Sequence, residues 1–355
     1  MRRTLPLAVL LACGGTSAGT STTVTSDSTS AATSNSPTGT TAADTSASTG
    51  LDVPCNSSPD AVADCVEAER YATDLEFIAA IRDPGSPHWQ AVQDLCFNRL
   101  TELGYQVELH NYGTGINVIG RRLGTTTPEE IVLVGAHYDH IPDCSGADDN
   151  GTGMAATLEV ARVLADVSVA RTIMIACWDE EELGLIGSRA FASQSAQDGT
   201  QFVANFTLET MGFTSDAPNS QQIPPGLDLA FPDTYSEIEA NEFRGDSIIL
   251  MANAAAETSA ADFVAQADRI GLKTALLALP AGTETSPLFS ELRRSDHAPF
   301  WDEGYPAMML TDSANFRNSH YHCIGGPDEI VDLDEEFAVL VTRATAGAAA
   351  SAAGL

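Results

Sequence analysis

Two apolar runs, each followed by histidine or acidic side chains, constrain the fold more than any other feature of this sequence. The run 131–136, IVLVGA, is followed by His137, and the run 173–177, IMIAC, leads into the acidic stretch 179–182. Between them, a glycine-rich turn carries Asp149. Carboxylates gathered at the ends of buried strands are unfavourable unless a positive charge lies among them. The stretch therefore predicts a site for one or two divalent metal ions.

Strand and helix patterns alternate through the middle of the chain. The segments 130–137, 171–178 and 201–210 have the continuous apolar character of buried strands, and 152–166 and 185–193 have helical spacing. This order predicts a mostly parallel sheet with helices on both faces, in which ligands bind at the carboxyl ends of the strands. We expect a single three-layer α/β/α domain with a mixed, mostly parallel sheet.

The remaining pattern extends this domain in both directions. A long segment at 212–247 has no regular periodicity, and a loop of this length usually forms a lid or a binding wall. The other predicted elements are helices at 60–81, 87–103, 254–272 and roughly 329–350, and strands at 105–110, 116–121, 273–279 and 305–312.

The amino terminus has the layout of an export signal. Two arginines precede a short apolar core that ends at Cys13, which resembles a bacterial lipoprotein signal cleaved before the cysteine. Ordinary secretion is the alternative. We expect 1–12 to be the signal, 13–54 a disordered Ser/Thr-rich tether and 55–355 the folded domain, exported and lipid-anchored in a bacterial cell envelope.

Charge and cysteine content limit the partners and the compartment. The chain has 49 acidic and 17 basic residues, a net charge of −32, which repels nucleic acid and anionic lipid surfaces. The even number of cysteines after Cys13 permits disulfides in an exported protein, and Cys55 and Cys65 are close enough to pair. Cys177 lies in an apolar strand and is expected to be a buried thiol. The other cysteines are Cys96, Cys144 and Cys323.

A set of histidines and carboxylates at or near these strand ends suits zinc. Imidazole and carboxylate are zinc ligands, and two adjacent metal ions need a bridging carboxylate, for which Asp149 is well placed. Glu181 and Glu182 are adjacent and point in different directions, so one can bind metal while the other contacts a water. The candidate ligands are His137, Asp149, Glu182, Glu209 and His322.

The motifs HYD, GADDNGTG, EEELGLIGS, SDHAPF and HYH occur in the order found in the co-catalytic zinc exopeptidases. The chain resembles that family, which includes bacterial leucyl aminopeptidases, aminopeptidase Y, glutamate carboxypeptidase and the glutaminyl-peptide cyclases. The resemblance implies two zinc ions, with Asp149 bridging them and Glu181 as the general base. It further implies that His137 binds one ion and is oriented by Asp139, that Glu182 and His322 bind the other, and that Tyr321 polarises the scissile carbonyl.

The sequence departs from the family pattern at two places. Glu209 occupies a ligand position that is often Asp, and the segment after His322 lacks the usual Thr-Pro-Glu-Asp. Asp296 and His297 belong to the pattern, and we interpret them as a structural pair near the site. His88, His110 and His140 are interpreted as structural.

The resemblance implies an exported metallo-aminopeptidase that hydrolyses the first peptide bond of a peptide substrate. Glutaminyl-peptide cyclisation on the same scaffold, typically with one zinc, is an alternative. A surface-anchored binding module that has lost the chemistry is a third.

Overall fold

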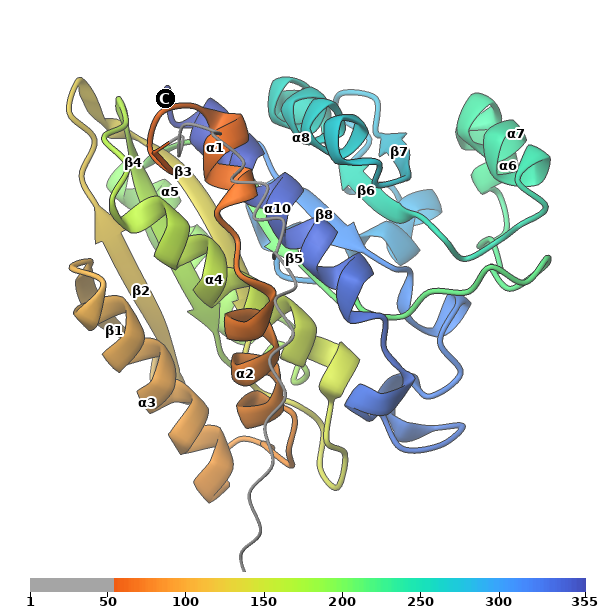
Figure 1. Cartoon of the computed structure of the whole chain (residues 1–355), viewed down its shortest axis with the longest axis horizontal. Helices are drawn as coiled ribbons and strands as arrows, with labels where there is room; N and C mark the ends of the chain where they lie inside the picture. The colour runs from red at the N-terminus through yellow and green to blue at the C-terminus, as the bar shows by residue number, and fades with distance from the viewer. Residues whose placement is uncertain (1–53) are drawn as a thin grey trace, which may run out of the picture. The chain divides into compact units, whose positions relative to one another are not determined.

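The computed structural model describes residues 54–355 (Figure 1). The predicted signal 1–12, the lipidation site Cys13 and nearly all of the tether 13–54 lie outside the described residues. Within the described part, an eight-stranded sheet has the order β1-β2-β4-β3-β5-β8-β6-β7. The strands are β1 (Gln106–Asn111), β2 (Ile116–Arg122), β3 (Thr127–His137), β4 (Arg171–Trp178), β5 (Gln201–Leu208), β6 (Ile248–Ala252), β7 (Thr274–Ala278) and β8 (Met308–Thr311).

The centre of the sheet is parallel, as predicted. β4, β3, β5 and β8 pair in parallel, whereas β1–β2, β2–β4 and β8–β6 pair antiparallel. Since the four parallel strands run the same way, their carboxyl ends meet at one edge of the sheet. The α-helices are α1 (Pro59–Asp64), α2 (Ala68–Ile78), α3 (Pro87–Glu102), α4 (Gly153–Ala165), α5 (Ile186–Asp198), α6 (Leu227–Ala230), α7 (Pro232–Ala240), α8 (Glu257–Ile270), α9 (Ala298–Asp302) and α10 (Glu335–Ala352).

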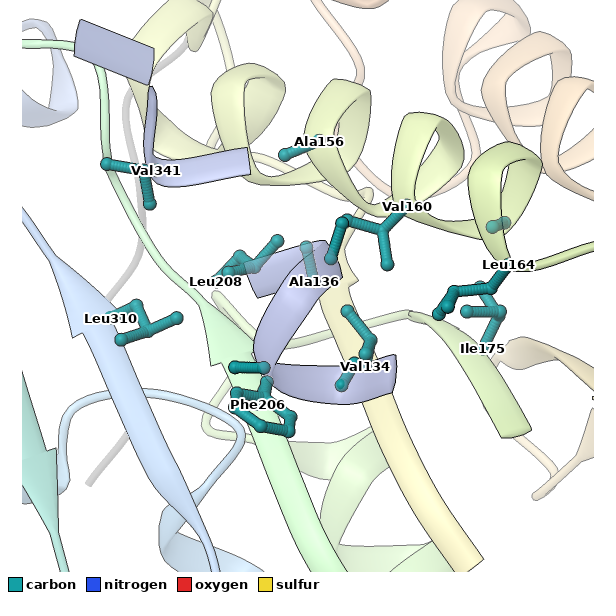
Figure 2. Packing of buried hydrophobic residues seen from close by; sticks show 14 of the residues in the cluster. Val134, Ala136, Ala156, Val160, Leu164, Ile175, Phe206, Leu208, Leu310 and Val341 are labelled. Carbon is teal, nitrogen blue, oxygen red and sulfur yellow. The ribbon is translucent and has the colours of Figure 1, made fainter. Parts of the chain in front are cut away.

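Alternate residues of β3 enter two separate cores. Val132 and Val134 pack in the larger core, with residues of α1, α2, α3, α4, α8 and α10. Leu133 points to the opposite face and packs with Phe191 of α5 and Phe300 of α9. Figure 2 shows part of the larger core, in which Val134 and Ala136 lie beneath the side chains of α4. Helices therefore cover both faces of the sheet, and the predicted three-layer fold is confirmed.

Local signals explain where several helices begin. Ser86 accepts a hydrogen bond from the Trp89 amide (3.2 Å), and Pro87 occupies the first turn of α3. Asp334 caps α10 by accepting a hydrogen bond from the Phe337 amide (3.0 Å).

Some sequence predictions were wrong in their boundaries. The helix expected at 60–81 is two helices, because the chain turns at Cys65, which is bonded to Cys55. The final helix begins at Glu335 rather than near 329. The segment 212–247 contains the short helices α6 and α7, and the strand β6 that follows it was missed although its sequence is apolar.

Two disulfides join residues of the described part of the chain, Cys55–Cys65 and Cys144–Cys323. Cys96 and Cys177 are buried free thiols, as expected for Cys177. The second disulfide links segments that are 179 residues apart in the sequence.

Candidate metal centre

The predicted ligands converge at the edge where the parallel strands end. His137 is the last residue of β3, the acidic stretch 179–182 follows β4, and Glu209 follows β5. His322 comes from an irregular loop between β8 and α10. His137 and Glu209 are therefore positioned by strand ends, whereas Glu182 and His322 lie on loops.

Asp149 lies between the two histidines. Its Oδ1 is 3.2 Å from His137 Nε2, and its Oδ2 is 3.0 Å from His322 Nε2. A second carboxylate lies beside each imidazole: Glu209 Oε2 is 3.3 Å from His137 Nε2, and Glu182 Oε2 is 3.2 Å from His322 Nε2. The site therefore has two half-sites that share one carboxylate, His137 with Glu209 and His322 with Glu182.

The chemistry of these atoms fits a pair of divalent ions. Among the described residues, His137 Nε2, His322 Nε2 and both carboxylate oxygens of Asp149 are buried without a well-aligned hydrogen-bond partner. Buried polar atoms normally have partners, so a convergent group of unsatisfied donor atoms indicates a bound ligand. Two groups of three residues have ligand atoms within 4.8 Å of one another. They are His137 with Glu181 and Glu209, and His140 with Asp149 and Glu182.

Electrostatics within the site are dominated by burial and by these contacts. Burial disfavours a charged imidazole at His137, but the carboxylates of Glu209 and Glu181 outweigh it and raise the pKa of His137 well above its usual value. The pKa of His322 is likewise raised, to about 10, because contacts with Asp149 and Glu182 outweigh burial. Burial opposes ionisation of Asp149, yet the two histidines hold its pKa well below the usual range. These contacts therefore favour the protonated form of both imidazoles.

Asp139 holds the loop that carries the two glutamates. Its Oδ1 accepts from the Glu181 amide (3.1 Å) and its Oδ2 from the Glu182 amide (3.2 Å). Asp139 Oδ1 also lies 3.5 Å from His137 Nδ1, on the far side of the ring from Asp149. Asp139 is therefore placed to orient the histidine and the acidic loop together.

Glu181 is buried and points toward the His137 half-site, where its carboxylate is within reach of His137 and Glu209. Burial raises its pKa well above the usual value, and the neighbouring carboxylates of Glu209 and Asp296 raise it further, against the effect of His137. A carboxylate with a raised pKa can exchange a proton near neutral pH.

His140 lies in the site, contrary to its interpretation as structural. It is fully buried, and its Nδ1 is 2.6 Å from Glu182 Oε1. The other oxygen of Glu182, Oε2, faces His322. The spacing of His137 and His140, three residues apart at a strand end, was the available signal. His320 points away from the site and pairs with Asp332 (3.0 Å), so the structure places His322, not His320, beside Asp149.

A buried arginine supports the turn that carries Asp149, and sequence reasoning missed it. Arg82 is fully buried and donates to the backbone oxygens of Tyr138 (3.1 Å), Gly146 (2.8 Å) and Asp149 (3.1 Å). It also donates to the nearby carbonyls of Ile78 (3.5 Å) and Ala80 (3.4 Å). No sequence pattern marks a side chain whose partners are all backbone carbonyl groups.

Asp296 and His297, predicted to be a structural pair, have different surroundings. His297 bonds through Nε2 to the Leu292 carbonyl (2.8 Å), packs edge-on against Trp301, and burial lowers its pKa to about 3. Asp296 is fully buried, and its oxygens have no hydrogen-bond partner among the described residues. His297 is thus structural. Asp296 is an electrostatic neighbour of Glu181, and burial raises the pKa of Asp296 itself to about 7.

An apolar pocket opens beside the His137 half-site. Glu209 and Tyr321 line its end near the site, and the 212–247 segment supplies one wall through residues such as Ile223 and Phe231. Met251 and other residues of β6, β7 and β8 form its floor. The Tyr321 ring stacks on His322 with centroids 3.9 Å apart, and the Arg294 guanidinium lies 5.5 Å from the centre of the Tyr321 ring.

The α/β/α fold and the cluster of histidines and carboxylates define a class, that of metal-dependent hydrolases built at the carboxyl edge of a parallel sheet. The sequence model of the protein family described as "Peptidase family M28" matches residues 117–335, more than half of the chain. The chain therefore belongs to peptidase family M28, and the resemblance to zinc exopeptidases is confirmed. The predicted class, a zinc-dependent peptidase, is confirmed at the level of the family.

Individual relatives match parts of their own length. The uncharacterized protein YfbL of Escherichia coli is 28% identical over 214 residues, 55% of this chain and 59% of that protein. Aminopeptidase YwaD of Bacillus subtilis is 38% identical over 101 residues, 28% of this chain and 22% of that protein. In both cases this chain covers less than two thirds of the relative.

Solved structures share the fold. The aminopeptidase from Aneurinibacillus sp. strain AM-1 has a TM-score of 0.62 at 15% identity, covering 84% of this chain and 96% of that chain. A glutaminyl cyclase from Porphyromonas gingivalis has a TM-score of 0.51 at 18% identity, covering 79% of this chain and 96% of that one. Both likenesses support the three-layer architecture.

Proposed function

We propose that this chain is an exported aminopeptidase that removes N-terminal residues with large apolar side chains, using two divalent metal ions, most naturally zinc. The observation that carries the proposal is the position of Asp149, whose two oxygens face two different histidines, each with its own second carboxylate. A cyclase with one zinc has no need of two complete half-sites.

Each half-site offers three ligands to one ion. His137, Asp149 and Glu209 would hold one, and Asp149, Glu182 and His322 the other. When bound, such ions supply Lewis acidity toward a substrate carbonyl and lower the pKa of a water.

The protein's own groups handle the proton. Glu181 accepts a proton from the attacking water and delivers it to the departing amine, which suits a carboxylate whose pKa lies above its usual value. Asp139 keeps Glu181 in place through the bond to its backbone amide (3.1 Å). Tyr321, which stacks on His322 and lines the apolar pocket, would donate a hydrogen bond to the substrate carbonyl.

The surroundings favour the amino end of a peptide. The apolar pocket next to Glu209 suits an apolar side chain. Glu209 and Glu291 on its lining attract a positive terminal amine, while Arg294, which lines the same pocket 3.4 Å from Glu291, offsets part of that charge. The net charge of −32 further disfavours a substrate that enters by its carboxylate.

Two features support export. The disulfides Cys55–Cys65 and Cys144–Cys323 are typical of proteins that fold in oxidising compartments. The Mycobacterium tuberculosis relative named probable lipoprotein aminopeptidase LpqL is 38% identical over 81 residues, 22% of this chain and 16% of that protein. In residues 54–355, every helix is too short or too polar to cross a bilayer. Anchoring through Cys13 remains part of the proposal.

A peptide-library digest read by mass spectrometry tests the activity. We expect stepwise release of N-terminal residues, with leucine-sized and aromatic residues favoured, and loss of release with chelator. Pyroglutamate formation from N-terminal glutamine without hydrolysis would favour the cyclase instead. Peptide binding with neither product would favour the binding module.

A further inference from the structure

The loop that carries His322 has a backbone that its own sequence does not favour. His322 and Cys323 both adopt left-handed conformations, with φ of 55° and 54°, although neither is glycine. Two consecutive non-glycine residues of this kind persist only where surrounding contacts hold them. No strand or long helix contains them, so other ties must fix His322.

A covalent tie begins at the next residue. Cys323 is bonded to Cys144, which lies five residues before Asp149 on the loop that follows β3. The disulfide therefore joins the loop of one candidate ligand to the loop of another, across 179 residues of sequence.

Asp328 provides a second tie between the same two loops. Its carboxylate accepts from the backbone amides of Asp148 (3.0 Å) and Asp149 (3.1 Å), and its carbonyl accepts from the Ala147 amide (3.3 Å). The Asp328 amide in turn contacts Cys323 Sγ (3.4 Å). The disulfide and Asp328 thus hold the segment 322–328 against 144–149.

We propose that the Cys144–Cys323 disulfide, assisted by Asp328, is a positioning device for the second metal ion. It holds His322 Nε2 beside Asp149 (3.0 Å) and Glu182 (3.2 Å), the two residues with which His322 would share an ion. This inference rests on the proposed two-ion function. It predicts that a thiol-reducing environment lowers the affinity for the ion at His322 and leaves the affinity for the ion at His137 unchanged.

The selectivity follows from the architecture. His137 and Glu209 sit at the ends of β3 and β5, which are paired in the centre of the sheet. Opening the disulfide leaves those strands intact. Asp149, the third ligand, lies on the tied loop, but Arg82 still donates to the carbonyls of Gly146 (2.8 Å) and Asp149 (3.1 Å) and holds that turn. The ion held by His137 and Glu209 therefore keeps its ligands. A general loss of stability, expected for any broken disulfide that closes a long loop, would not separate the two ions.

The test uses the full chain with Cys144→Ser/Cys323→Ser, and Cys55→Ser/Cys65→Ser as the matched control. Zinc is titrated against a competing chelator, and thermal unfolding of the metal-free proteins reports stability separately. We expect the Kd of one ion to rise about tenfold to a hundredfold in the first variant, with the other ion and the control unchanged. His322→Ala should weaken the same ion.

If the double variant fails to fold, the disulfide can be opened after folding. In the Cys55→Ser/Cys65→Ser background, folded protein is reduced, its thiols are capped with iodoacetamide, and the reductant is removed before titration. Unchanged Kd values for both ions, or equal weakening of both, would overturn the inference while leaving a two-ion wild type consistent with the proposed function. A wild-type protein that binds one ion or none would overturn both.

Discussion

The two half-sites of the candidate centre are built from different kinds of structure. His137 and Glu209 lie at the ends of adjacent parallel strands, and the His137 side chain is fully buried. Glu182 and His322 lie on loops, and the His322 side chain is 27% exposed. A strand end holds its side chain through the hydrogen bonds of the sheet, whereas a loop needs separate ties, here Asp139, the Cys144–Cys323 disulfide and Asp328. The same ligand chemistry thus depends on the core in one half and on local anchors in the other.

Replacing Glu181 should have the largest effect, because it is the proposed proton acceptor in the reaction. Glu181→Gln removes the proton acceptor and keeps the side-chain shape, so kcat should fall about 100-fold to 10,000-fold while both ions remain bound. Steady-state kinetics with a leucyl-nitroanilide and zinc analysis of the same sample measure both quantities. The neighbouring Glu180→Gln is the control, and a variant that retains full activity at Glu181 would contradict the assignment.

Replacing Asp149 should lower the metal affinity of both half-sites, whereas replacing any other ligand should lower the affinity of only one. Asp149→Ala removes the carboxylate that faces both histidines, so both ions should weaken by more than the roughly 100-fold seen for groups outside the ligand set. Glu209→Ala should instead weaken one ion. Competitive zinc titration distinguishes these cases, and loss of a single ion in Asp149→Ala would show that the residue does not join the half-sites.

Acid should weaken metal binding in both halves. In the metal-free protein the pKa of His322 is raised to about 10 and that of His137 is also raised, so near pH 7 a bound proton competes with the metal at each. Raising the pH removes this competition up to about pH 10 for His322, so affinity should increase about tenfold per pH unit for each proton displaced. Calorimetry in buffers of different ionisation enthalpy measures the protons released; an affinity that is flat from pH 6 to 8 would contradict these pKa shifts.

His140 should have a smaller effect, confined to the loop half. Its Nδ1 contacts Glu182 Oε1 at 2.6 Å, so His140→Ala should weaken the ion at Glu182 by about tenfold and spare the ion at His137. His110, which bonds to Gln194 away from the site, is a matched histidine control. Equal weakening of both ions would assign His140 to general folding instead.

The sequence predicted the strand half better than the loop half. Apolar runs placed His137 and Glu209 at strand ends, and the parallel order then required those ends to meet. The position of His322 rested on the resemblance to a family, because no periodicity marks an irregular loop. The partners of Cys144 and the role of Asp328 depend on contacts between segments about 180 residues apart, which local patterns do not encode.

The fold, too, was predicted only in outline, because local patterns do not encode contacts between distant segments. The three-layer architecture followed from alternating patterns, but the break between α1 and α2 at Cys65 depends on a disulfide whose pairing the sequence left open. Arg82 was missed because its partners are all backbone carbonyls, several of them in a distant turn.

The number of zinc ions bound by the intact chain tests the central claim most directly. Purified protein, stripped of metal and titrated with zinc against a competing chelator, should bind two ions per chain, with one of them lost in His322→Ala. A single ion per chain that persists in His322→Ala would contradict the two half-sites joined by Asp149.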